Sequence, residues 1–262
     1  MKVRSVVAPV LGVLAFFGLW ELFVRVGDIP SFELRPPSQI LRYLFGDRGD
    51  ARFDRVGFAS ATLETGFDAV RSIVLALVIG FVVGSLMAAS RWLEEAALPV
   101  LILVQVTPWV VYSASVVLWL DGGQTPVLFI GTLVCVPAFS YATTVGLRSA
   151  DPATLELMRT VDASWWETLW RVRLPHALPG LFTATRFAIG LSIAAVYFTE
   201  GGALVNRGLG AVGKAAINGS QTLAVWSTAF CAASLGALGL ILIGLLERLL
   251  LGWHASQRRG AR

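Results

Sequence analysis

The stretch Leu223–Leu246, LAVWSTAFCAASLGALGLILIGLL, runs for 24 residues without a charged side chain. A helix needs about 20 apolar residues to cross the ~30 Å hydrocarbon layer of a bilayer, so this stretch is long enough to span one. Because lipid offers the backbone no hydrogen-bond partners, an α-helix is the expected form of such a span. The stretch therefore predicts a transmembrane helix.

Five further charge-poor runs of similar length precede this stretch along the chain. The composition agrees with so many spans, because 56% of the 262 residues are apolar, 15% are charged and the mean hydropathy is +0.71. A single soluble core would not bury that much apolar surface. The alternating pattern of about ten residues that marks a membrane β-barrel is absent. We therefore expect an all-α polytopic membrane protein with one transmembrane domain, residues 1–262, and six transmembrane helices at about 5–25, 69–89, 96–120, 126–146, 181–198 and 223–246.

The first predicted span follows Lys2 and Arg4, a basic start that secretory signals share. No small-residue cleavage site follows Trp20, so we expect this segment to remain as a helix. In the connecting segments, eleven lysines and arginines lie on the side of the N-terminus and eight on the other. The positive-inside rule then predicts a multi-pass protein of the inner or plasma membrane with both termini in the cytoplasm.

The segment between the first two spans, residues 27–60, is expected to be external. It contains Pro36 and Pro37, which are tolerated at the start of a helix. The apolar residues that follow share one helical face. This pattern predicts a short helix in the membrane interface, and the alternative is a loop that packs on the bundle; the apolar residues are Ile40, Leu41, Leu44 and Phe45.

Pro108 interrupts the third predicted span and has polar neighbours. A proline frees a carbonyl and bends a helix, so one interpretation is an ordinary kink. The other is a water-filled path through the bundle, lined by polar groups. The polar residues of the fifth span would belong to the same path, although Arg186 could instead snorkel to the interface or pair with a carboxylate. The candidate path residues are Gln105, Thr107, Trp109, Tyr112, Arg186, Ser192, Tyr197 and Glu200.

The segment between the fourth and fifth spans, residues 149–179, carries the signals of two short helices. Asp151 is a good N-cap and Pro152 suits the first helical position, so a first helix is expected to run to about Val161. Ser164 stands three residues before Glu167, which predicts a capping box at a second helix. Proline residues 175 and 179 are expected to end that helix and to open the fifth span.

Residues 156–175 also resemble the cytoplasmic signature of ABC importer permeases, which reads E-A-A, three residues, G, nine residues, I-x-L-P. The spacing fits Glu156, Asp162 and Val172-Arg173-Leu174-Pro175. Leu157-Met158 replaces the two alanines, and Asp162 replaces the glycine. Aspartate is among the few residues that adopt the left-handed conformation at modest strain, so we expect the turn to survive. Segments 36–38 and 175–181 resemble the subfamily that moves nitrate, sulfonate, taurine or related small anions.

The resemblance implies the six-helix bundle of a type I ABC importer permease, which passes a small solute from a binding protein into the cytoplasm. That solute would be anionic, like a sulfonate, taurine or nitrate, or else aromatic or heterocyclic. The implied partners are ABC ATPase subunits that bind ATP and Mg, a second permease copy or paralogue, an extracytoplasmic substrate-binding protein and membrane lipid. This chain itself would bind no cofactor. The first short helix would be the coupling helix, and the implied ATPase contacts are Glu156, Leu157, Met158, Asp162, Ala163, Leu174 and Pro175.

Other classes of function fit the sequence less well. A secondary transporter driven by an ion gradient is the main alternative, but its expected intramembrane acid is missing because Glu21, Asp68 and Glu200 lie at the ends of the predicted spans. An enzyme would need a cluster of histidine, aspartate or cysteine residues, which the sequence lacks. Nucleic-acid binding does not follow from the net charge of +4, since the arginines are scattered among loops. Cys135 and Cys231 fall inside spans and predict neither a disulfide nor a metal site.

Overall fold

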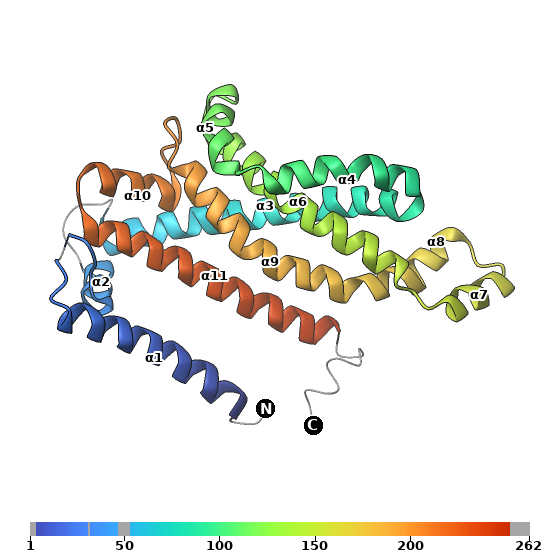
Figure 1. The fold of residues 1–262 in the computed structure, drawn as a ribbon, viewed down its shortest axis with the longest axis horizontal. Helices are drawn as coiled ribbons and strands as arrows, with labels where there is room; N and C mark the ends of the chain where they lie inside the picture. Colours follow the sequence, from blue (N-terminus) through green and yellow to red (C-terminus); the bar gives the residue numbers. More distant parts are fainter. Residues whose placement is uncertain (1–3, 31, 47–52, 252–262) are drawn as a thin grey trace.

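A computed structural model describes residues 4–30, 32–46 and 53–251, and these form helices joined by short connections (Figure 1). No β-strand occurs among them, which confirms the predicted all-α class. The elements are α1 (Arg4–Val26), α2 (Pro37–Leu44), α3 (Arg55–Ala89), α4 (Arg91–Val106), α5 (Trp109–Trp119), α6 (Gln124–Arg148), α7 (Pro152–Thr160), α8 (Trp165–Thr168), the π-helical segment η1 (Leu169–Arg173), α9 (Leu174–Glu200), α10 (Gly208–Asn218) and α11 (Thr222–Leu250).

Four helical segments in the described part of the chain are long and apolar enough to cross a membrane: 55–89, 124–148, 165–200 and 222–250. The bent pair α4 and α5 would make a fifth span if it crosses as one unit. Helix α1 has 23 residues and nearly coincides with the first expected span, residues 5–25. The polytopic class is confirmed, whereas the number of six spans stays a prediction.

The centre of the bundle is formed by α3, α6 and α9, which lie side by side (Figure 1). Ala76, Phe139 and Ala188 are fully buried in their shared core. Small side chains let the helix backbones approach closely, as is common where membrane helices pack. One such contact joins the Thr144 hydroxyl to the carbonyl of Gly84, at 3.1 Å. The packing of α3, α6 and α9 therefore fixes the position of the helices at both ends of the bundle.

The third expected span, 96–120, is not one helix. Helix α4 ends at Val106, α5 begins at Trp109, and the two meet at an angle of 95°. Thr107 is extended, with ψ at 122°, because the proline ring that follows disfavours the helical conformation. The break at Pro108 therefore exceeds a kink, and α5 leaves the bundle axis sideways (Figure 1).

The expectation that two prolines end the helix before the fifth span is wrong. Residues 165–200 form one continuous helical run, and α9 begins at Leu174 rather than near residue 181. The reason is the π-helical turn η1, in which the amide of Leu174 bonds to the carbonyl of Leu169, five residues back. A widened turn gives room for the ring of Pro175, which would clash with a carbonyl in a regular α-helix.

Helix α3 begins earlier than expected, and the segment predicted to be external, 27–60, therefore ends in helix. Asp54 caps α3 by accepting a hydrogen bond from the amide of Gly57, at 2.8 Å. The short helix predicted after the two prolines is α2. Its Ile40 is fully buried while Phe45 is exposed, so α2 packs on the bundle with one face and leaves the other open.

Candidate functional site

The two ends of the bundle carry different structures. Helices α7 and α8 project from one end, whereas α2 and α10 cover the other (Figure 1). The helical run from α8 through η1 and α9 connects the two ends directly. At 1.5 Å per residue, such a run of 36 residues is about 54 Å long.

The start of α7 is fixed by its cap. The Asp151 carboxylate accepts hydrogen bonds from the amides of Ala153 and Thr154, at 3.4 and 3.2 Å, and from the Thr154 hydroxyl at 3.0 Å. The hydroxyl bond, followed by the amide bond of the same threonine, lowers the pKa of Asp151 below its usual value. The carboxylate is therefore ionised at neutral pH, and the predicted N-cap is confirmed.

The end of α7 depends on Asp162, the residue at the position of the signature's glycine. Its φ is +48°, in the left-handed region that glycine favours. The amide of Asp162 bonds to the carbonyl of Arg159 at 3.1 Å, and the amide of Ala163 to that of Met158 at 3.0 Å. These two bonds form a Schellman motif. The predicted left-handed turn is thus confirmed with aspartate in place of glycine.

Helix α8 begins with the predicted capping box. The Ser164 side chain accepts a hydrogen bond from the amide of Glu167 at 3.2 Å, and the Glu167 carboxylate accepts one from the Ser164 amide at 3.0 Å. Reciprocal bonds of this kind satisfy two free amides of a helix start. Both short helices therefore have defined ends.

The outer surface of these helices is apolar. Five large apolar side chains are between 53% and 67% exposed, and α7 buries no residue at all. We call this set the loop surface; it consists of Leu157, Val161, Trp165, Trp166 and Trp170. An exposed apolar patch of this kind marks an interaction site.

The predicted ATPase contacts fall into two groups. Glu156, Leu157 and Met158 lie on α7 itself, with Asp162 and Ala163 in the turn that ends it. Leu174 and Pro175 instead lie at the start of α9, where both are half-buried. The geometry therefore places only the first group at the projecting tip.

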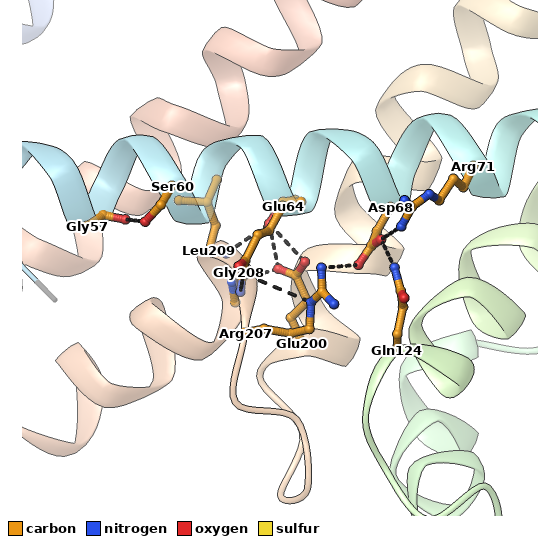
Figure 2. Close-up of polar contacts among 12 residues, drawn as sticks. Gly57, Ser60, Glu64, Asp68, Arg71, Gln124, Glu200, Arg207, Gly208 and Leu209 are labelled. Atoms are coloured by element: carbon orange, nitrogen blue, oxygen red, sulfur yellow. Dashed lines mark hydrogen bonds and ion pairs between the residues drawn. The ribbon is translucent and has the colours of Figure 1, made fainter.

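The opposite end of the bundle holds a buried carboxylate. Glu200, at the end of α9, has no exposed surface (Figure 2). It accepts hydrogen bonds from the Thr65 hydroxyl at 2.7 Å and from the Gly210 amide at 3.0 Å. The same threonine accepts a bond from the Leu209 amide at 2.8 Å. Glu64 accepts one from the Gly208 amide, also at 2.8 Å. The free amides at the start of α10 are thus satisfied by side chains of α3 and α9.

A second buried carboxylate, Asp68, lies one helical turn further along α3. It accepts a hydrogen bond from the side-chain amide of Gln124 at 2.5 Å, and it forms ion pairs with Arg71 at 3.3 Å and Arg207 at 3.7 Å (Figure 2). Arg207 also lies 4.0 Å from Glu64. We call the set Glu64, Thr65, Asp68, Glu200 and Arg207 the polar clamp, because it ties α10 and its preceding loop to α3 and α9.

Sequence reasoning found only part of this clamp. It placed Asp68 and Glu200 at span ends; Glu200 does end α9, and both residues are fully buried. Asp68 lies well inside α3, which begins thirteen residues earlier at Arg55. The spacing of four between Glu64 and Asp68 did put both on one helical face, a signal that was available. Nothing local to Arg207 pointed to its carboxylate partners.

Two of the candidate path residues meet at one cavity. Trp109 and Tyr197 line a hollow of about 620 Å³ between α5, α9 and α11. The Trp109 ring meets Phe198 edge to face with centroids 5.5 Å apart, and the Tyr197 hydroxyl bonds to Thr228 at 2.8 Å. We call this the aromatic cavity; its other walls come from small and aliphatic residues such as Gly190, Ala194, Ala229 and Ala233.

The other candidate path residues have different surroundings. Gln105 and Thr107 are exposed, and Tyr112 packs beside the central core. Ser192 is buried and donates to the carbonyl of Ala69 at 3.2 Å, while Glu200 belongs to the clamp. Arg186 pairs with Glu247 of α11, as the alternative interpretation of that residue predicted.

Metal chemistry finds no support in the part of the chain that the structure describes. No three histidine, cysteine, aspartate or glutamate side chains there form a group that could hold an ion. Cys135 and Cys231 are buried and unbridged.

Comparison with known proteins identifies relatives along most of the chain. The model of the family described as "Binding-protein-dependent transport system inner membrane component" matches residues 76–252. The riboflavin transport system permease protein RibX of Chloroflexus aurantiacus is 35% identical over 63% of this chain and 62% of its own length. The taurine transport system permease protein TauC of Escherichia coli is 27% identical over 92% of this chain and 84% of its own.

A solved structure shares the fold. A chain of the MetNI methionine ABC transporter, in an inward-facing conformation, superimposes with a TM-score of 0.58 at 17% identity. The match covers 72% of this chain and 95% of that chain. At this identity the likeness concerns the fold alone.

Proposed function

This chain belongs to the family of binding-protein-dependent transport inner membrane components, and we propose that it is the permease subunit through which an ATP-driven importer passes a small solute. Its multi-pass helical bundle fits a permease. The family match favours this function over a secondary transporter driven by an ion gradient. The relatives are transport permeases, so we assign no enzymatic activity to the chain and place ATP hydrolysis, with ATP and Mg, on a separate ATPase subunit.

The observation that carries the proposal is the loop surface, which covers α7, α8 and the adjoining residues Val161 and Trp170. A short helix with fixed ends that exposes Leu157 and Val161 at 62% and 64% is suited to fill a groove on a partner. We infer that this partner is the ATPase and that Glu156, exposed on α7, supplies a polar contact beside the apolar ones. The α7 end then faces the cytoplasm, with both termini.

The helical run from α8 through α9 connects the docking site on the ATPase side with the opposite end of the bundle. Because Trp165 to Glu200 is one continuous run, a rigid-body movement of the loop surface moves the polar clamp at the far end. We propose that the clamp end faces the extracytoplasmic side and the substrate-binding protein. A second permease copy or a paralogue completes the transporter, since family members act in pairs in the type I arrangement that the resemblance implies.

The buried acids of the clamp do not call for a proton- or sodium-driven mechanism. The Glu200 carboxylate already accepts from Thr65 and Gly210, and Asp68 accepts from Gln124 and pairs with two arginines. Buried carboxyl groups with hydrogen-bond or ion-pair partners are tolerated inside a protein. The clamp residues thus act by positioning α10.

The aromatic cavity is the part of the bundle that we assign to the solute path. Trp109, Tyr197 and Phe198 present faces and edges of rings, and the walls carry no charged side chain. Such a lining suits an aromatic or heterocyclic solute and lets a small sulfonate, taurine-like or nitrate-like anion pass without tight binding. The relatives' names span both solute classes.

Site-specific cross-linking tests the docking assignment. A Leu157→Cys variant, derivatised with a short photoreactive probe in membranes, is expected to cross-link to the ATPase, because this side chain is exposed on α7. The matched control, Ile217→Cys, is equally exposed at 64% but lies on α10 at the opposite end, and it should give no such product. A cross-link from position 217 and none from 157 would invert the assignment.

A further inference from the structure

A groove near the α7 end of the bundle adjoins the loop surface and shares Trp165 and Trp166 with it. It has a volume of about 330 Å³ and is lined by α3, α6, α8 and η1. Leu147 and Leu169 are buried in it, at 3% and 9% exposure, whereas Val82 and Leu86 are about half exposed. The groove is therefore open on the side of α3 and closed towards α6.

The open side of the groove continues an exposed apolar stripe. Along α3, apolar side chains at intervals of four residues are each more than half exposed: Val70, Val74, Val78, Val82 and Leu86. Residues 72–90 carry no charge, and Arg91 follows directly. The groove thus lies where the hydrocarbon layer meets the headgroups. Trp165 and Trp166, which also line it, are residues typical of that boundary.

Two polar groups in the groove lack partners. Arg173 lines it from η1, and it forms no ion pair with any carboxylate in the described ranges. Its neighbour Arg171 lies 3.9 Å from Glu167, and Arg91 lies 3.4 Å from Glu95. The Ser85 hydroxyl, on the α3 side of the groove, is buried without a hydrogen-bond partner.

We propose that this groove binds an anionic phospholipid, with one acyl chain against Leu86 and Leu147 and the phosphate at the guanidinium of Arg173. A guanidinium pairs with a phosphate through two parallel hydrogen bonds, which gives the unpaired arginine a partner. The apolar wall suits an acyl chain, and the single cation suits an anionic headgroup. The bound lipid contacts Leu169 and Arg173 of η1, and so braces the segment through which α7 and α8 join α9.

Native mass spectrometry of the purified chain tests this binding independently of transport. The protein is incubated with equal amounts of phosphatidylglycerol and phosphatidylcholine of identical acyl chains. The wild type should retain phosphatidylglycerol in preference. Arg173→Gln should retain about fivefold less of it, the ratio that corresponds to about 1 kcal/mol for one basic residue at a membrane surface. Arg91→Gln is the matched control, because it removes a charge at the same end but outside the groove.

A second variant tests the apolar wall of the groove separately from the charge of Arg173. Val82→Trp fills the open side at a half-exposed position and should reduce retention of both lipids. Equal retention of the two lipids by the wild type, or unchanged retention in Arg173→Gln, would overturn the proposal. Disulfide cross-linking of Val82→Cys between two copies in membranes would also overturn it, by showing that another permease covers the groove.

Discussion

Replacing Gly210 with valine is expected to displace α10 and to destabilise the protein severely. A Cβ at this position would overlap the carbonyl oxygen of Tyr197 and would lie 2.7 Å from the Cβ of Glu200 and 2.8 Å from the amide nitrogen of Gly201. None of these atoms is the free end of a flexible side chain. Helix α10 must therefore move, and the Gly210 amide then leaves the buried Glu200 carboxylate. A buried polar group left without a partner costs about 1–3 kcal/mol, and overpacking of the site adds about 1–3 kcal/mol.

Thermal unfolding in detergent measures this effect. The melting temperature should fall by about 10 °C or more, given a shift of about 2–4 °C per kcal/mol for chains of this size. Gly219→Ala is the matched control at the other end of α10, where the nearest atom to a new Cβ is 3.4 Å away and φ is negative. If the two variants melted together, the clamp would not hold α10 as the contacts imply.

Replacing Asp162 with valine is expected to release the ATPase while the membrane bundle stays folded. The residue has a φ of +48°, a conformation that strains a β-branched side chain by about 1–3 kcal/mol. Relief of that strain breaks the two hydrogen bonds that end α7. Since no residue of α7 is buried, the strain alters the conformation of α7 and does not destabilise the membrane bundle. A loss of 1.4 kcal/mol in docking corresponds to a tenfold loss of affinity.

Co-purification of the ATPase with tagged permease measures this loss. Asp162→Val should retain at most about a tenth of the ATPase, and Glu156→Lys, which reverses an exposed charge on α7, should also retain less. Asp162→Gly is the control, because glycine adopts a positive φ without strain and should retain at least the wild-type amount. All three variants should melt close to the wild type. Retention by the valine variant equal to that of the glycine variant would remove α7 from the docking site.

The features that the sequence predicted correctly are local ones. The Asp151 cap joins residues two and three apart, and the capping box joins Ser164 to Glu167. The two hydrogen bonds of the turn at Asp162 join residues three and five apart. Each is determined by neighbours in the chain, so side-chain type and spacing suffice to find it.

The features that the sequence did not predict depend on distant residues or on backbone geometry. Thr65 and Glu200 are 135 residues apart, and Glu64 and Gly208 are 144 apart, so no local pattern could pair them. The length of α9 depends on a π-helical turn, which has no clear signature in side-chain periodicity. Pro108 signalled a disturbance, but the angle of 95° depends on how α5 packs against α6 and α9.

Uptake by reconstituted vesicles tests the central claim, that this chain passes its solute only when an ATPase drives it. The solute is taken as the ligand that co-purifies with the cognate binding protein. Uptake is expected only when the binding protein, the ATPase and ATP are all present, with no change when proton and sodium gradients are abolished. Uptake that persists without the ATPase under a proton or sodium gradient would show that this chain is a secondary transporter.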